Sequence, residues 1–129
     1  MEINPTYVDF EQAKLLKEKG FNITTRTAYD YRIYRPSNLH EENLEIINNA
    51  KNYSNSEYER FQRPEQWQVV EWALKNYNIW ISVQPNEPFT DDDWCFKIFK
   101  NNQLIMSLEG YDSPKNAYIE AINEFLKMI

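Results

Sequence analysis

Cysteine, glycine and histidine are scarce in this chain, and each scarcity excludes a class of site. The 129 residues include one cysteine (Cys95), two glycines and one histidine (His40). A single cysteine excludes an internal disulfide and a zinc site built from several cysteines. Two glycines leave almost no room for a glycine-rich phosphate-binding loop. Any catalysis by an imidazole would have to use His40.

Long apolar runs and basic clusters are also missing. No run approaches the roughly 18 apolar residues of a membrane span, and the start MEINPTYVDF lacks the features of a signal peptide. The formal net charge is -6 and the isoelectric point is about 4.8, which disfavours non-specific binding to nucleic acid or anionic membranes. We therefore predict a soluble cytoplasmic protein with neither nucleic acid nor a membrane as its partner.

Aromatic side chains, in contrast, are abundant. The chain has nine Tyr, seven Phe and four Trp, and 42% of its residues are hydrophobic. Such a chain has enough core-forming side chains to fold, and its length suits one domain with its own core. We predict a single domain over residues 1–129, in which residues 36–63 form a partly irregular insert and the first candidate for a mobile segment.

The central stretch, residues 64–84, combines a helix and a strand. Apolar side chains recur at helical spacing up to residue 77 and share one arc, which predicts a core-facing helix. From residue 79 the period changes to two, as in a half-buried strand. The residues of the helical arc are Trp67, Val69, Val70, Ala73, Leu74 and Tyr77.

Two further strands and a helix follow this centre. We predict strands over residues 94–100 and 103–109, then a helix that begins at Ser113 and Pro114. The second half thus has the order helix, strand, strand, strand, helix. This order predicts an α+β fold, an antiparallel sheet with helices packed on one face.

The loop between the last two strands is predicted from the faces of the strands. A three-residue loop over residues 100–102 places Ile98 opposite Leu104 and Phe96 opposite Met106, so that apolar side chains share a face. A two-residue turn would mix the faces. We therefore predict the three-residue loop.

The second face of this sheet is expected to be unusually apolar. Such a face is rarely left in water. Either the N-terminal half of the chain extends or covers the sheet, or the face is a docking patch. Its expected residues are Trp80, Ser82, Cys95, Lys97, Phe99, Ile105 and Ser107.

The first half of the chain is harder to interpret. Asp9 and Gln12 form a capping box for a helix over residues 10–19. Strands are expected over 22–28 and 31–35, and a short helix over 39–49, followed by a polar linker up to residue 63.

Three features were weighed as catalytic or metal-binding sites. Asp91, Asp92 and Asp93 could gather a divalent cation, but their spacing matches no known metal loop. His40 is expected at the surface near a helix start. Cys95 lies in a strand with no predicted base beside it, which favours a role as small core filler. We therefore predict no catalytic, metal or cofactor site. These features favour a protein that is not an enzyme.

Two features are candidates for binding a partner. Tyr29, Tyr31, Arg32, Tyr34 and Arg35, with Arg26 nearby, could stack bases and neutralise phosphates, or they could be ordinary strand residues with charged neighbours. Trp72 lies about 60° outside the apolar arc of its helix, so it is either buried by the N-terminal half or an exposed interface anchor. The partner-binding residues that we predict are Trp72, Trp80, Phe99, Tyr31, Arg32, Tyr34 and Arg35.

Three stretches carry a resemblance to a known group of proteins. They are YVDFEQAKLLKEKGF at 7–21, PEQWQVVEWALKNYNIWISV at 64–83 and SPKNAYIEAINEFLK at 113–127. Together they resemble small uncharacterised proteins encoded in phages, prophages and mobile elements of gut-associated Bacteroidetes. The resemblance implies a genomic setting and assigns no role to any residue. The helix, three strands, helix order is also similar to that of double-stranded-RNA-binding domains, but the start of the last helix, 113–116, holds one Lys instead of a cluster, so we expect no RNA binding by that route.

The function that these features favour is protein binding. We expect a non-enzymatic accessory protein of a phage or mobile element that binds a protein partner, such as a host factor. One alternative is a nucleic-acid-binding accessory protein that uses the Arg and Tyr residues of 26–35. The other is a metal-assisted hydrolase that uses Asp91–Asp93.

Overall fold

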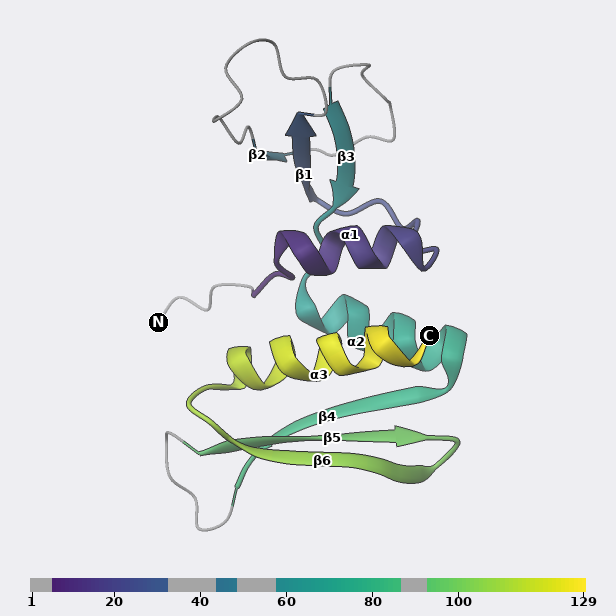
Figure 1. Cartoon of the computed structure of the whole chain (residues 1–129), viewed down its shortest axis with the longest axis vertical. Coiled ribbons are helices and arrows are strands. Elements are labelled where there is room, and N and C mark those ends of the chain that lie inside the picture. The colour runs from purple at the N-terminus through teal and green to yellow at the C-terminus, as the bar shows by residue number, and fades with distance from the viewer. Residues whose placement is uncertain (1–5, 33–43, 49–57, 87–92) are drawn as a thin grey trace. The chain divides into compact units, whose positions relative to one another are not determined.

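The computed structural model describes residues 6–32, 44–48, 58–86 and 93–129 (Figure 1). The strands form two antiparallel three-stranded sheets, in the orders β2-β1-β3 and β4-β5-β6. Together with the helices they confirm the predicted α+β class. The elements are α1 (Phe10–Glu18), β1 (Thr27–Arg32), β2 (Leu44–Asn48), β3 (Tyr58–Gln62), α2 (Gln66–Tyr77), β4 (Ile79–Pro85), β5 (Trp94–Lys100), β6 (Gln103–Tyr111) and α3 (Pro114–Met128).

The chain divides into two compact units. The N-terminal unit is Tyr7–Pro64, and the C-terminal unit is Met1–Thr6 together with Glu65–Ile129. Each unit holds one of the two sheets. The single domain expected over 1–129 stays a prediction. Among the described residues, no helix combines the length and the apolar character that a membrane crossing requires.

The C-terminal unit has the predicted order of helix, three strands and helix. Both α2 and α3 lie on the same face of the sheet (Figure 1). Ser113 caps α3 by accepting a hydrogen bond from the backbone N–H of Asn116 at 3.1 Å, and Pro114 occupies the first turn, where its missing N–H costs nothing. Buried side chains from the strands and α3 fill the space between the two layers, including Ile79, Ile81, Phe96, Ile98, Ala121, Ile122 and Phe125.

Asparagines replace glycine at the tight turns of this unit. Asn78 ends α2 with a φ of 54°, and Asn101 and Asn102 turn the β5–β6 hairpin with φ values of 50° and 66°. Asparagine tolerates this left-handed region better than most residues. The side-chain amide of Asn78 donates to Oδ1 of Asn101 at 2.9 Å, so the helix end and the hairpin turn hold each other.

The hairpin corrects the predicted three-residue loop. Lys100 pairs with Gln103, which leaves a two-residue turn. A β-bulge then lets Ile98 pair with Met106 and Phe99 with Leu104, so Ile105 is the extra residue on β6. A bulge shifts the alternation of a strand by one residue. We expected a longer loop to keep the apolar side chains of the two strands on one face. The bulge in β6 does this instead, next to a two-residue turn.

Helix α2 buries only part of the predicted arc, because Val69, Val70 and Ala73 are buried as expected but Trp67 and Leu74 are exposed. Trp67 is 56% exposed, whereas Trp72 is 7% exposed. The ring of Trp72 packs edge-on against Tyr77 and Phe125, at centroid distances of 5.3 and 6.0 Å. The buried side of α2 is therefore set by α3, which supplies Phe125, and an exposed anchor at Trp72 is excluded.

In the N-terminal unit, α1 packs against a small sheet. Its capping box forms as predicted, because the Asp9 carboxylate accepts from the N–H of Gln12 at 2.8 Å and the Gln12 side chain accepts from the N–H of Asp9 at 3.2 Å. The ring of Phe10 lies 5.4 to 5.6 Å from the rings of Tyr29, Tyr31 and Phe61. This aromatic cluster joins the helix to β1 and β3.

The strands of this unit correct several predictions. Strands were expected over 22–28 and 31–35, but the described residues form one strand there, β1 over 27–32, and residues 33–35 lie outside the described part. Residues 44–48 of the predicted 39–49 helix are strand β2, which pairs antiparallel with β1, and residues 39–43 lie outside the described part. Ile46 and Ile47 suit a strand as well as a helix, and the partner strand decides between the two.

The predicted linker up to residue 63 contains a further strand. Residues 58–62 form β3, the second partner of β1. The N-terminal strands therefore pair with one another. Of the two expected arrangements, extension of the C-terminal sheet by these strands is wrong, and covering of its outer face by the N-terminal half stays a prediction.

Candidate functional site

A row of apolar side chains crosses the face of the C-terminal sheet that is opposite to α2 and α3. Trp80 on β4 pairs with Phe99 on β5, and Phe99 pairs with Leu104 on β6. Trp80 faces away from the helices because its neighbours Ile79 and Ile81 are buried. Trp80 is 44% exposed, Leu104 53% and Ile105 45%. We call Trp80, Phe99, Leu104 and Ile105 the sheet patch.

The prediction for this face was correct except at two positions. Trp80 and Ile105 are exposed and Phe99 is half-buried, as expected of an apolar outer face. Leu104 was expected in the core opposite Ile98, but the bulge brings it opposite Phe99 on the outer face. Cys95 is a buried free thiol and adds nothing to the exposed surface, which agrees with its role as core filler.

One cation borders the sheet patch. Lys97 occupies the next rung of the sheet, between Ser82 on β4 and Ser107 on β6. Its half-buried side chain alternates with the buried Phe96 and Ile98, which places it on the outer face. The patch is thus a largely apolar surface with the positive charge of Lys97 beside it.

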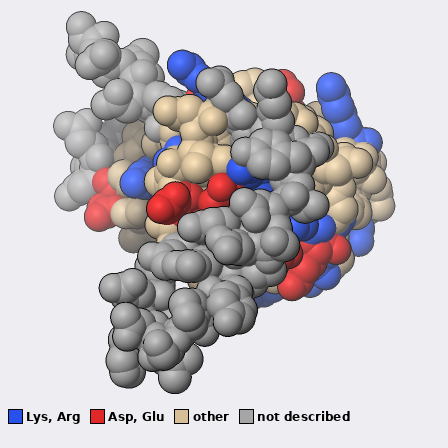
Figure 2. Space-filling view, turned by 90° about the horizontal axis from the view of Figure 1, so that it is seen from above, with Lys and Arg blue, Asp and Glu red and all other residues tan. Residues whose placement is uncertain are grey.

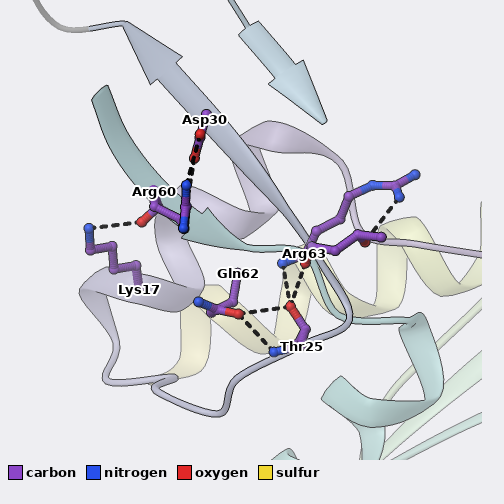
Figure 3. Close-up of polar contacts among 7 residues, drawn as sticks. Lys17, Thr25, Asp30, Arg60, Gln62 and Arg63 are labelled. Carbon is purple, nitrogen blue, oxygen red and sulfur yellow. Dashed lines mark hydrogen bonds and ion pairs between the residues drawn. The ribbon is translucent and has the colours of Figure 1, made fainter. Parts of the chain in front are cut away.

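The N-terminal unit holds a second arrangement of polar side chains, shown in Figure 3. The guanidinium of Arg60 donates from Nε and Nη2 to the two carboxylate oxygens of Asp30, at 2.8 and 3.0 Å. Both side chains are largely buried. Lys17 donates from Nζ to the backbone carbonyl of Arg60 at 3.1 Å and to Glu59 at 3.2 Å. The Asp30–Arg60 pair joins β1 to β3, and because each of its charges has a partner, it offers no free reactive group.

Thr25, Gln62 and Arg63 form a separate group of hydrogen bonds in the same unit (Figure 3). Oε1 of Gln62 accepts from the N–H of Thr25 at 2.8 Å, and Oγ1 of Thr25 accepts from the N–H of Arg63 at 3.0 Å. The guanidinium of Arg63 lies 3.8 Å from the ring centroid of Tyr7, a cation–π contact. Arg63 was not among the predicted residues, because Tyr7 and Arg63 are 56 positions apart in the sequence and no local pattern signals their contact.

The two described tyrosines of the predicted Arg and Tyr stretch are used for packing. Tyr29 is buried and its hydroxyl donates to the carbonyl of Val8 at 2.7 Å, while the ring of Tyr31 stacks on Phe10. Neither ring is presented as a platform for bases. Arg26 is exposed, and Arg32 ends β1. Tyr34 and Arg35 lie outside the described residues.

Charges of both signs are mixed on the surface seen in Figure 2. Lysine and arginine alternate there with acidic side chains among the described residues of that view. A nucleic-acid interface usually gathers its cations into one patch or stripe. The view shows no such gathering in the described part.

The acidic loop lies almost entirely outside the described residues, since Asp91 and Asp92 belong to the undescribed range, as does His40. Asp93 is described, and its backbone carbonyl accepts from the N–H of Asn86 at 2.8 Å. The Asn86 amide also donates to Glu109 at 2.7 Å. In the described ranges, no group of three or more His, Cys, Asp or Glu side chains could hold a metal ion.

Two tyrosines of the C-terminal unit have perturbed acidity. Desolvation raises the pKa of Tyr111, and the carboxylates of Glu120 and Glu124 raise it further. Burial raises the pKa of Tyr118. Both phenols therefore stay protonated at neutral pH, and neither is activated as a base or nucleophile.

Comparison with protein-family models, with curated proteins and with solved structures found no match for this chain.

Proposed function

We propose that this chain is a non-enzymatic accessory protein of a phage or mobile element, and that it binds a protein partner through the sheet patch. The observation that carries the proposal is the row across all three strands of the exposed Trp80, the half-buried Phe99 and the exposed Leu104. Rows of large apolar side chains on an open sheet face are costly to leave in water. Tryptophan in particular is enriched among the residues that dominate interface energetics.

Charge defines the chemistry of this partner. Two copies of the patch closing face to face would bring two Lys97 ammonium groups into one buried interface, which is unfavourable. A partner that offers apolar side chains and one carboxylate opposite Lys97 has no such penalty. We therefore propose a different protein, such as a host factor in the cytoplasm, as the occupant of the patch.

A pair of tryptophan variants tests the proposal. Trp80 and Trp67 are both exposed and both lie in the C-terminal unit, but only Trp80 belongs to the patch. Tagged wild-type, Trp80→Ser and Trp67→Ser proteins are incubated with host lysate, and the recovered proteins are quantified by mass spectrometry. We expect one partner to be recovered equally by wild type and Trp67→Ser, and at least about tenfold less by Trp80→Ser.

Two results would count against this function. Equal recovery of every protein by Trp80→Ser and wild type would remove the patch as the binding surface. Turnover of a substrate by the purified chain, with no partner recovered, would replace binding by catalysis.

A further inference from the structure

Strand β6 ends the C-terminal sheet and carries apolar side chains on both of its faces. It spans nine residues and pairs only with β5 among the described strands. Leu104 and Ile105 lie on the outer face. Leu108 pairs with the buried Phe96 on the helix side, yet it is 45% exposed because it lies at the rim of the sheet. A strand added beside β6 would cover apolar surface on both faces, whereas a partner on the outer face alone would leave Leu108 in water.

The edge of β6 is only partly protected against such pairing. Proteins usually protect an edge strand with proline, lysine or bulges. Strand β6 contains no proline and no basic residue, and Glu109 is its one charged residue. Its extra residues, Ile105 and Gly110, lie at two irregularities of the pairing with β5. These irregularities bracket a regular stretch, Met106–Glu109, whose other edge has no partner among the described strands.

We propose that β6 pairs antiparallel with β6 of a second copy of this chain, around a two-fold axis at Ser107. Directly opposite residues in an antiparallel pair share a face. With Ser107 opposite Ser107, Met106 of each copy lies opposite Leu108 of the other, both on the helix side. The two sheets join into one, with the helices of both copies on the same face.

Self-complementarity favours a second copy as the occupant of this edge. A two-fold contact brings the same surface of each copy together, so like charges on that surface would repel. In the proposed register Glu109 falls opposite Ile105, and no carboxylate meets a carboxylate. Glu109 is the one acidic residue of the paired stretch, so the rest of the acidic charge of the chain lies outside it. The inference does not require the proposed function, because the pairing uses the backbone edge of β6, although Leu104 and Ile105 belong to the sheet patch as well.

A cysteine placed on the axis tests the register directly. In the pairing, the Cα atoms of opposite residues lie about 4.5–5.5 Å apart, which a disulfide can span. We expect Ser107→Cys to form a disulfide-linked dimer on mild oxidation. The matched control is Gln103→Cys, since the two copies of residue 103 would lie about 26 Å apart at about 3.3 Å per residue. Wild type, whose one cysteine is buried, measures the background.

The association itself is measured by sedimentation equilibrium of the full chain. A pairing of strands this short buries little surface, and interfaces of that size bind weakly. We therefore expect the average mass to rise towards that of a dimer between about 10 µM and 1 mM of protein. A lysine on the edge should weaken the dimer, so Leu108→Lys should lower the association constant at least about tenfold. Leu74→Lys, the same change at a comparably exposed position of α2, should leave it unchanged.

Either of two results overturns the inference. A constant monomer mass up to 1 mM, with Ser107→Cys linked no faster than Gln103→Cys, shows that the edge stays open or takes a different strand. A dimer that Leu108→Lys leaves intact shows that the copies meet elsewhere. Near-ultraviolet circular dichroism of each variant confirms that it is folded before either result is interpreted.

Discussion

Replacing Trp72 by alanine should lower the unfolding free energy of the C-terminal unit by about 4 kcal/mol. Truncating a buried Phe or Trp to Ala typically costs about 3–5 kcal/mol. The Trp72 ring is almost fully buried and makes edge-on contacts with Tyr77 and Phe125, each of which adds about 0.5–1.5 kcal/mol beyond buried area. A loss of this size is a large part of the roughly 5–15 kcal/mol that holds an ordinary domain folded.

Trp67 supplies the matched control on the same helix. It is more than half exposed, and its indole N–H donates to the exposed Glu65 carboxylate at 2.7 Å. Trp67→Ala makes the same chemical change with the same gain in helix propensity, but it opens no cavity. We expect it to cost less than about 1 kcal/mol, as surface substitutions do.

Tryptophan fluorescence during urea unfolding is the appropriate assay. All four tryptophans of the chain, Trp67, Trp72, Trp80 and Trp94, belong to the C-terminal unit, so the signal reports on that unit alone. The difference in midpoint, multiplied by the denaturant slope, gives the difference in free energy. Equal losses of unfolding free energy for Trp72→Ala and Trp67→Ala would refute the burial argument and would favour an exposed interface role for Trp72.

Four further outcomes are expected. Asn102→Gly should raise the stability of the C-terminal unit by about 0.5 kcal/mol, because glycine adopts the positive φ of that turn position without strain, and urea unfolding would show a fall instead if the turn differs. Asp30→Ala should cost the N-terminal unit about 3 kcal/mol or more by leaving Arg60 buried without its carboxylate, and hydrogen exchange of the β1 and β3 amides should accelerate, whereas unchanged exchange contradicts this role. Because the pKa values of Tyr111 and Tyr118 are raised, the folded state binds their protons more tightly than the unfolded state does. Their contribution to the unfolding free energy should be fully present below the ordinary tyrosine pKa of about 10 and should be lost as pH rises through the folded-state pKa values. A spectrophotometric titration at 295 nm in which no phenol titrates late would refute this. Titration with single- and double-stranded DNA and RNA should show no binding that falls steeply with salt, and a steep salt slope would revive the nucleic-acid alternative.

Local signals predicted much of the fold. The capping box at Asp9 and Gln12 and the Ser113–Pro114 start of the last helix are interactions among residues a few positions apart, so the sequence alone reveals them. The same holds for the alternation that placed Trp80, Phe99 and Ile105 on one outer face. These elements lie where they were expected.

The errors concern contacts between residues far apart in the chain. Residues 44–48 are compatible with helix or strand, and β1 makes them a strand by offering a hydrogen-bonding partner. Leu104 moved to the outer face because a bulge, invisible in the apolar pattern, shifts the alternation.

By itself, the sequence determined the class of the fold, the helix starts and the apolar character of the outer sheet face, because each depends on periodicity or on neighbours within about one helical turn. The tertiary structure alone decided that Trp72 is buried, that the N-terminal strands form their own sheet and that Arg63 lies on Tyr7. Those outcomes depend on which distant segment supplies the opposing surface. Burial and strand pairing stabilise such a contact only after the chain has brought the two segments together.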